Sequence, residues 1–179
     1  MMTDPLGRER PVGRPADLRT LMAAFPTGVS VVTATGRDGT LRGMTCTSLC
    51  SVSLDPPVLL VCLRRGSPTL EAVVDSGLFA VNLLHAQARS TAELFASGAP
   101  DRFERVVWQA GEGAAGPHLT HSSHTVADCL LINTQAIGDH TVVLGGVDTV
   151  TPVMDRRPLL YGLRRYASWP GIALSSVET

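Results

Sequence analysis

Hydrophobic and polar positions follow a helical period near the N-terminus, and most of the chain after it shows runs typical of strands. The helical stripe is formed by Leu18, Leu21, Met22 and Phe25. It predicts a short helix that packs its apolar face on a larger body and ends before Pro26 and Gly28.

Most of the remaining pattern consists of β-branched and apolar runs separated by turn residues. The predicted strands cover residues 29–35, 41–48, 58–63, 78–84, 126–137, 141–151 and 159–166. One short helix is expected before residue 78 and another over residues 87–95. Because no strand–helix–strand rhythm is present, the pattern favours a mainly β fold, an antiparallel barrel that is closed or nearly closed.

The chain has 179 residues, which is the size of one domain. We expect an N-terminal arm over residues 1–14, the domain over 15–170 and a C-terminal tail over 171–179. A net charge of -1 gives no overall positive field for nucleic acid or anionic lipid, so a small-molecule partner is expected. Four cysteines without a C-x-x-C pair, and no apolar leader or membrane-length stretch, predict a cytoplasmic protein with reduced thiols.

Candidate chemistry begins with the segment Gly43-Met44-Thr45-Cys46-Thr47-Ser48. It offers hydroxyls and backbone amides without a strong acid or base, which suits hydrogen bonding to the neutral edge of a planar ring. Further on, Ser67 can cap a helix that starts at Pro68, next to Arg64 and Arg65. Free backbone N–H groups and guanidinium groups bind phosphate, although a plain capped helix with solvated arginines explains this motif equally well. Together the two segments predict a site for a planar cofactor that carries phosphate.

Two other patterns have simpler interpretations. Residues 111–116 match G-x-G-x-x-G, but Pro117 and polar residues follow in place of an amphipathic helix, so we expect a loop. His118, His121 and His124 are spaced by three, yet no carboxylate or cysteine lies beside them until Asp128 and Cys129, so no metal site is assigned.

The cysteines and one turn histidine complete the candidates. Cys46, Cys50 and Cys62 fall in or beside strands and are interpreted as small packing residues, which argues against covalent catalysis. His140 follows Gly138-Asp139 in a predicted hairpin turn, where a solvated imidazole is the ordinary finding.

Several motifs occur in an order that is specific when taken together, and they span nearly all of the chain from Leu18 to Tyr166. They cover residues 25–33, 43–48, 51–57, 67–70, 77–84, 138–141 and 145–147, with Phe103 and Trp108. This order resembles the short-chain NAD(P)H:flavin reductases, which act as reductase components of two-component flavin-dependent monooxygenases.

The resemblance implies a Greek-key split β-barrel homodimer that binds FAD or FMN, with NADH or NADPH as cosubstrate. The segment Gly43–Ser48 would then hydrogen-bond the flavin ring and ribityl chain, and Cys62, Leu63 and Arg64 would lie along the flavin. Ser67, Pro68 and Thr69 would hold phosphate. His140 would position the nicotinamide without donating a proton. Thr47 departs from the pattern, because many relatives have an amide residue there.

The function expected from these features is reduction of free flavin for a separate monooxygenase or halogenase. A reductase that passes on its reduced flavin must release it, so few strong charge-assisted contacts are expected. A site rich in neutral hydroxyl groups is consistent with this. Two alternatives stay open at this point: a non-catalytic flavin- or haem-binding barrel, and a split-barrel oxidase with tightly held FMN.

Overall fold

Ten strands and three helices make up residues 17–170, the part of the chain that this computed structural model describes. The helices are α1 (Leu18–Ala23), α2 (Pro68–Ser76) and α3 (Arg89–Ser97). The strands are β1 (Thr27–Gly28), β2 (Ser30–Thr35), β3 (Leu41–Cys46), β4 (Cys50–Leu54), β5 (Pro57–Arg64), β6 (Leu78–Leu84), β7 (Ser123–Ile137), β8 (His140–Pro152), β9 (Leu159–Gly162) and β10 (Arg165–Ser168). The predicted arm over 1–14 and tail over 171–179 lie outside the described residues.

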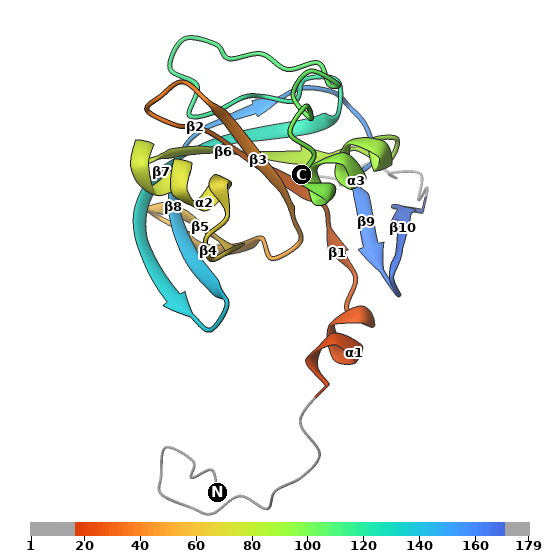
Figure 1. Cartoon of the computed structure of the whole chain (residues 1–179). Coiled ribbons are helices and arrows are strands. Elements are labelled where there is room, and N and C mark those ends of the chain that lie inside the picture. The colour runs from red at the N-terminus through yellow and green to blue at the C-terminus, as the bar shows by residue number, and fades with distance from the viewer. Residues whose placement is uncertain (1–16, 171–179) are drawn as a thin grey trace, which may run out of the picture.

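The strands form two antiparallel sheets. A seven-stranded sheet has the order β3-β2-β6-β7-β8-β5-β4, and a smaller sheet has the order β1-β9-β10. Figure 1 shows the large sheet curling around itself, with α2 and α3 beside it and α1 standing away from the body at the end of β1. The mainly β, antiparallel fold expected from the sequence is confirmed, and its curled sheet is consistent with a split barrel.

Strand β2 is buried on both faces because two apolar cores meet at it. Val32 and Ala34 belong to a core inside the curled sheet, which α2 completes with Val73. Val31 belongs to a second core, which α3 completes with Phe95. Alternate residues of one strand therefore join two cores, which explains why the run 29–34 is buried throughout rather than at every second residue.

Two strands that lie near opposite ends of the large sheet are joined by a single hydroxyl. Ser48 follows β3, and its Oγ accepts a hydrogen bond from the Cys62 amide of β5 at 2.9 Å. The same Oγ donates to the Cys62 carbonyl oxygen, with 3.2 Å between the two atoms. A side chain thus satisfies backbone groups of β5 where no strand pairs with them, and it brings β3 close to β5.

The long loop between α3 and β7 is fixed by buried polar side chains. The Nδ2 of Asn82, a residue of β6 with no exposed surface, donates to the Pro117 carbonyl oxygen, and its Oδ1 accepts from the Leu119 amide. Asp128 accepts from the Ala115 amide at 2.7 Å and contacts His118 Nε2 at 2.8 Å. These contacts confirm that the glycine-rich stretch 111–116 is a loop and not the start of a helix.

Three expectations about the elements are wrong. Helix α1 buries no residue, and its Leu18 and Leu21 are 62% and 67% exposed, so it does not pack on the barrel of its own chain. Residues 50–54 form β4, which was not expected because polar residues interrupt its pattern. The expected strand over 159–166 is a hairpin, β9 and β10, with positive φ angles at Leu163 and Arg164.

Within residues 17–170, none of the helices has both the length and the apolar character needed to cross a membrane.

We expect substitution by alanine to have different effects on stability at two neighbouring glycines of β8. A Cβ on Gly145 would lie 2.4 Å from Cζ of the fully buried Phe79, whereas a Cβ on Gly146 would meet the end of the exposed Ile132 side chain at 3.3 Å. We expect Gly145→Ala to lower the free energy of unfolding by about 1–3 kcal/mol, as overpacking does. Gly146→Ala should change it by less than about 0.5 kcal/mol. Urea denaturation followed by circular dichroism measures both, and equal midpoints for the two variants would contradict the expectation.

Candidate functional site

The start of α2 has the local geometry expected from the sequence. The Ser67 side chain accepts a hydrogen bond from the Leu70 amide at 3.3 Å, and Pro68 occupies the first helical turn. The helix has nine residues and ends at Gly77, which adopts the left-handed conformation. Its N-terminus therefore presents the positive end of an ordered helix dipole.

A cavity of about 510 Å³, here called the α2 cavity, lies at this helix start. Three segments that are distant in sequence meet around it, namely β3, the end of β5 with the start of α2, and the end of α3 with the loop after it. The lining residues are Gly43, Met44, Thr45, Arg64, Ser67, Pro68, Thr69, Phe95, Ala96, Ser97, Gly98 and Arg102. Gly43 allows this approach, because a Cβ there would lie 2.9 Å from Cε1 of Phe95.

Arg102 is the most informative side chain in the α2 cavity. It is only 8% exposed, and its Nη1 donates to the carbonyl oxygens of Gly98 and Ala99 at 3.1 and 2.8 Å. Its Nε has no hydrogen-bond partner, and no carboxylate of the described residues forms an ion pair with it. Burial, and then the nearby charge of Arg42, lower the pKa of Arg102. A buried guanidinium without a counter-ion favours an anion in the cavity.

The hydroxyl groups along β3 are largely engaged within the protein. Thr45 Oγ1 donates to the Ala92 carbonyl oxygen at 2.6 Å, and Ser48 holds Cys62 as described above. Each oxygen keeps acceptor capacity, but the Thr45 proton is already used. Arg102 therefore supplies the strong interaction in this cavity, while β3 supplies weaker neutral contacts.

The α2 cavity gathers seven of the residues expected to bind cofactor: Gly43, Met44, Thr45, Arg64, Ser67, Pro68 and Thr69. The side chains of Cys46 and Leu63 lie in the apolar core, so only their backbones can contact a ligand. The backbone of Cys62 is bonded to Ser48. Thr47 and Ser48 line a different cavity of about 400 Å³, which faces α1.

The cysteine predictions have mixed outcomes. Cys46 is a buried core residue, as expected, and burial raises the pKa of its thiol. Cys129 is also buried, and burial raises its pKa to about 12. Cys50 is exposed, so the interpretation as a packing residue is wrong for this position.

His140 lies beside the α2 cavity through strand pairing. It is the first residue of β8, and the register of β5 and β8 places it opposite Arg64. Its Nδ1 lies 2.9 Å from Oδ1 of Asp139, and this hydrogen bond lowers the pKa of the Asp139 carboxyl. About half of the side chain is exposed, so the imidazole is accessible to a ligand.

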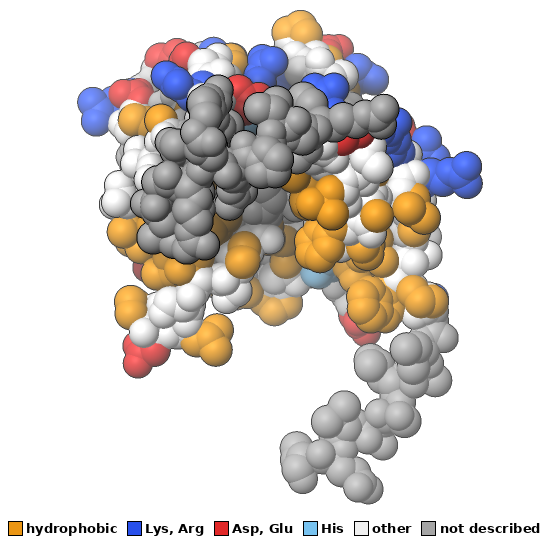
Figure 2. Space-filling view, turned by 90° about the horizontal axis from the view of Figure 1, so that it is seen from below, with side chains coloured by type: hydrophobic (Ala, Val, Ile, Leu, Met, Phe, Trp, Pro, Cys, Tyr) orange, Lys and Arg blue, Asp and Glu red, His pale blue; other side chains and the backbone are white. Residues whose placement is uncertain are grey.

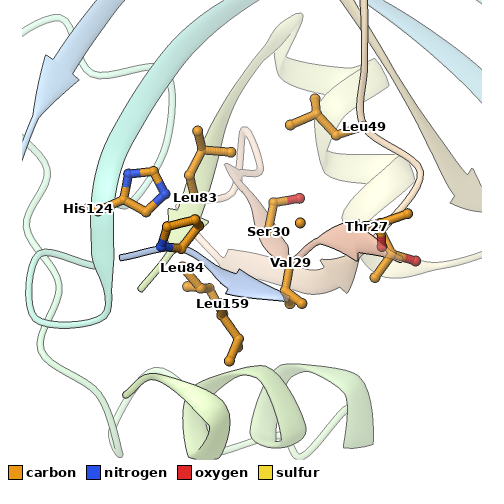
Figure 3. A pocket seen from close by; sticks show the side chains of 11 residues that line it. Thr27, Val29, Ser30, Leu49, Leu83, Leu84, His124 and Leu159 are labelled. Atoms are coloured by element: carbon orange, nitrogen blue, oxygen red, sulfur yellow. The ribbon is translucent and has the colours of Figure 1, made fainter. Parts of the chain in front are cut away.

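The three histidines at positions 118, 121 and 124 have separate surroundings. His118 contacts Asp128, whereas the carbonyl oxygen of His121 contacts Nε2 of His85 at 2.9 Å. His124 lines an apolar cavity of about 300 Å³ with Ser30, Leu83 and Leu159 (Figure 3). Burial lowers the pKa of His124, and His85 lowers it further. Within residues 17–170, no group of three His, Cys, Asp or Glu side chains is placed to hold a metal ion.

Comparison with known proteins identifies the family of this chain. The sequence profile of the flavin reductase like domain matches residues 22–170. The chain belongs to this flavin reductase-like family. It is 51% identical over 154 residues to a flavin reductase (NADPH) of Lentzea aerocolonigenes, with 86% of this chain and 89% of the relative covered. It is 42% identical over 152 residues to a flavin reductase (NADH) of Kitasatospora aureofaciens, covering 84% and 80%.

Solved structures place this flavin reductase-like chain in the same fold. The NADH:FAD oxidoreductase SgcE6 of Streptomyces globisporus, in complex with NAD and FAD fragments, superposes with a TM-score of 0.81 at 32% identity. That match covers 97% of this chain and 99% of SgcE6. BorF, the flavin reductase component of a bacterial two-component tryptophan halogenase, matches with a TM-score of 0.76 at 30% identity and covers 87% and 98%.

Sequence reasoning missed Arg102 and Phe95 as lining residues of the α2 cavity. Arg102 lies in a loop between Asp101 and Phe103, a local pattern that is typical of a solvated arginine. Arg102 differs from a solvated arginine only in being buried without a carboxylate partner among the described residues. Its burial depends on the approach of α3 to β3. No signal in the local sequence indicates that contact.

Proposed function

We propose that this protein uses NADH or NADPH to reduce FAD or FMN, and that the reduced flavin diffuses to a separate flavin-dependent monooxygenase or halogenase. The observation that carries the proposal is the buried Arg102, which lacks a carboxylate partner and lies beside the start of α2 in a flavin reductase-like chain. The family supports the reductase over the non-catalytic barrel and the FMN oxidase, because the names of the similar proteins describe flavin reductases.

The phosphate of the flavin is assigned to the α2 cavity. Arg102 provides a cation that no carboxylate of residues 17–170 pairs with, and the exposed Arg64 also lines the cavity. The α2 N-terminus adds backbone N–H groups and the positive end of its dipole. A flavin phosphate would relieve the cost of burying Arg102, so the residues present fit the group.

The flavin ring and ribityl chain are assigned to the β3 side of the same cavity. Gly43, Met44 and Thr45 offer backbone groups and one acceptor hydroxyl there, and none of them carries a charge. We assign His140 to the nicotinamide, because strand pairing places it opposite Arg64 with its side chain accessible. When both are bound, nicotinamide and flavin supply hydride transfer, and the protein contributes their orientation.

The composition of the site agrees with a flavin that is released. The β3 hydroxyls are engaged in the protein, so few strong hydrogen bonds hold the ring. One buried cation and one helix N-terminus provide most of the attraction, and both act on the phosphate. Oxidised and reduced flavin carry the same phosphate, so these contacts do not retain the reduced form selectively.

Turnover that depends on added flavin is the first expectation. Protein passed through a desalting column should oxidise NADH or NADPH only when FAD or FMN is added, measured by the loss of nicotinamide absorbance. A control without protein corrects for direct reaction. A yellow protein without nicotinamide oxidation would overturn the reductase assignment and favour the binding barrel or the oxidase.

Removal of the Arg102 charge should weaken flavin binding. We expect Arg102→Gln to raise the flavin KM by about tenfold, with a smaller change in kcat, because the loss of a charge-assisted contact affects binding. Arg102→Lys should restore part of the affinity, since it keeps the charge. Arg105→Gln is the matched control, because Arg105 is exposed and lies outside the α2 cavity.

Equal KM values for Arg102→Gln and Arg105→Gln would contradict this role. A loss of kcat without a change in KM would instead indicate that Arg102 only supports the loop carbonyls of Gly98 and Ala99.

We also propose that two copies of the chain form a homodimer through α1. Leu18, Leu21 and Phe25 are each at least 60% exposed, and α1 stands away from the body of its own chain. Figure 2, which views the molecule from the side of α1, shows hydrophobic side chains gathered on this face. The cavity of about 400 Å³ lined by Met22 and Phe25 lies on the same side. A second copy is the partner because the family resemblance implies a homodimer and an apolar helix of this kind needs a permanent cover.

Charged substitutions on α1 test the dimer. The double variant Leu18→Asp with Leu21→Asp should sediment as a monomer at concentrations where the natural chain is dimeric, because the interface would bury two unpaired charges. Val74→Asp is the control, since Val74 is half exposed on α2. Sedimentation velocity measures the outcome, and a natural chain that is monomeric would contradict the proposal.

A further inference from the structure

A second cavity adjoins the α2 cavity. It has a volume of about 450 Å³ and lies between the turn that joins β2 to β3 and the outer side of α2. We call it the hairpin cavity, and it is lined by Gly36, Arg37, Asp38, Thr40, Arg42, Pro68, Glu71, Ala72 and Asp75. Pro68 lines both cavities, and Arg42 of the hairpin cavity precedes Gly43 of the α2 cavity in β3. The two cavities therefore meet along the first turn of α2.

The two cavities differ in charge. The lining of the α2 cavity contains two arginines and no carboxylate, whereas the lining of the hairpin cavity contains three carboxylates and two arginines, Arg37 and Arg42. Arg42 lies near enough to Arg102 for its charge to help lower the pKa of that residue. Arg42 and Arg102 therefore line the two adjoining cavities, and all three carboxylates lie on the hairpin side.

Among the three carboxylates, Glu71 is available for a ligand. Asp38 accepts hydrogen bonds from the amide and hydroxyl of Thr40, and Asp75 forms an ion pair with Arg37 at 3.5 Å. No hydrogen bond or ion pair of the described residues engages the Glu71 side chain, which is exposed in the first turn of α2. A free carboxylate accepts hydrogen bonds from a neutral donor such as a sugar hydroxyl.

A ligand that extends through both cavities must be anionic near Arg42 and Arg102 and neutral, with hydrogen-bond donors, near Glu71. An adenosine diphosphate group has this order, because its phosphates are followed by a ribose diol and an uncharged base. In dinucleotide sites, acidic side chains accept hydrogen bonds from the ribose hydroxyls in this way. FMN ends at a single phosphate and would leave the hairpin cavity empty.

We propose that the hairpin cavity binds the adenosine half of FAD, with Arg42 on the second phosphate and Glu71 accepting from the ribose, so that the chain selects FAD over FMN. This inference rests on the proposed function, because it extends the flavin from the α2 cavity. The adenosine of NADH or NADPH has the same chemistry, so the experiment must separate the two sources.

Calorimetric titration with oxidised FAD and FMN, without nicotinamide, tests the inference. The natural chain should bind FAD at least about tenfold more tightly than FMN. Arg42→Ser and Glu71→Ala should each weaken FAD binding by about three- to tenfold and change FMN binding by less than about twofold. Arg105→Ser and Glu104→Ala are matched controls, because both residues lie in the loop after α3 and line neither cavity.

Two outcomes would overturn the inference while the proposed function stands. One is equal affinity for FAD and FMN in a chain that reduces both. The other is an Arg42→Ser variant with a raised KM for NADH or NADPH and unchanged FAD affinity, which would assign the hairpin cavity to the nicotinamide cosubstrate. A chain that binds and reduces neither flavin would instead contradict the proposed function itself.

Discussion

The contact between Ser48 and Cys62 joins the two strand regions on which the α2 cavity is built. Strands β3 and β5 lie near opposite ends of the large sheet, and no ladder of backbone hydrogen bonds connects them. The Ser48 hydroxyl exchanges two hydrogen bonds with the Cys62 backbone and holds the strands together. β3 carries Gly43–Thr45, and β5 leads to Arg64 and α2, so this contact joins the two strands that supply opposite walls of the α2 cavity. The cavity therefore depends on the closeness of two strand segments that are distant in the order of the sheet.

The α2 cavity combines a charged group on one side with neutral groups on the other. Arg102 is fixed by the carbonyl oxygens of Gly98 and Ala99, and no carboxylate of the described residues pairs with it. Thr45 and Ser48 use their hydroxyl protons within the protein, so the β3 side of the cavity offers mainly backbone and apolar groups. In the proposed reductase, affinity would then be concentrated at the phosphate end, where it does not distinguish oxidised from reduced flavin.

Much of the fold and part of the site were predictable from local sequence. The hairpin strands follow from β-branched runs and turn residues, and the start of α2 follows from Ser67 and Pro68, because caps and turns depend on neighbouring residues. Arg102 and the exposed position of α1 were not predictable, since both depend on contacts between distant segments. The apolar stripe of α1 predicts a buried face, but α1 buries no residue in its own chain, and a stripe cannot show which surface would cover it.

Because Arg64 pairs with His140, the turn at Gly138 and Asp139 sets the position of the imidazole as well as the register of β8. Gly138 adopts a positive φ of 58°, and β8 begins two residues later. Side chains of a strand alternate between its two faces, so a shift of β8 by one residue would turn the imidazole to the opposite side of the sheet. A change in turn length that shifted β8 by one residue would therefore remove the imidazole from the side it shares with Arg64, and it would turn the core-facing residues of β8 outward. The length of this turn is for that reason subject to two constraints at once, one from packing and one from the position of the imidazole.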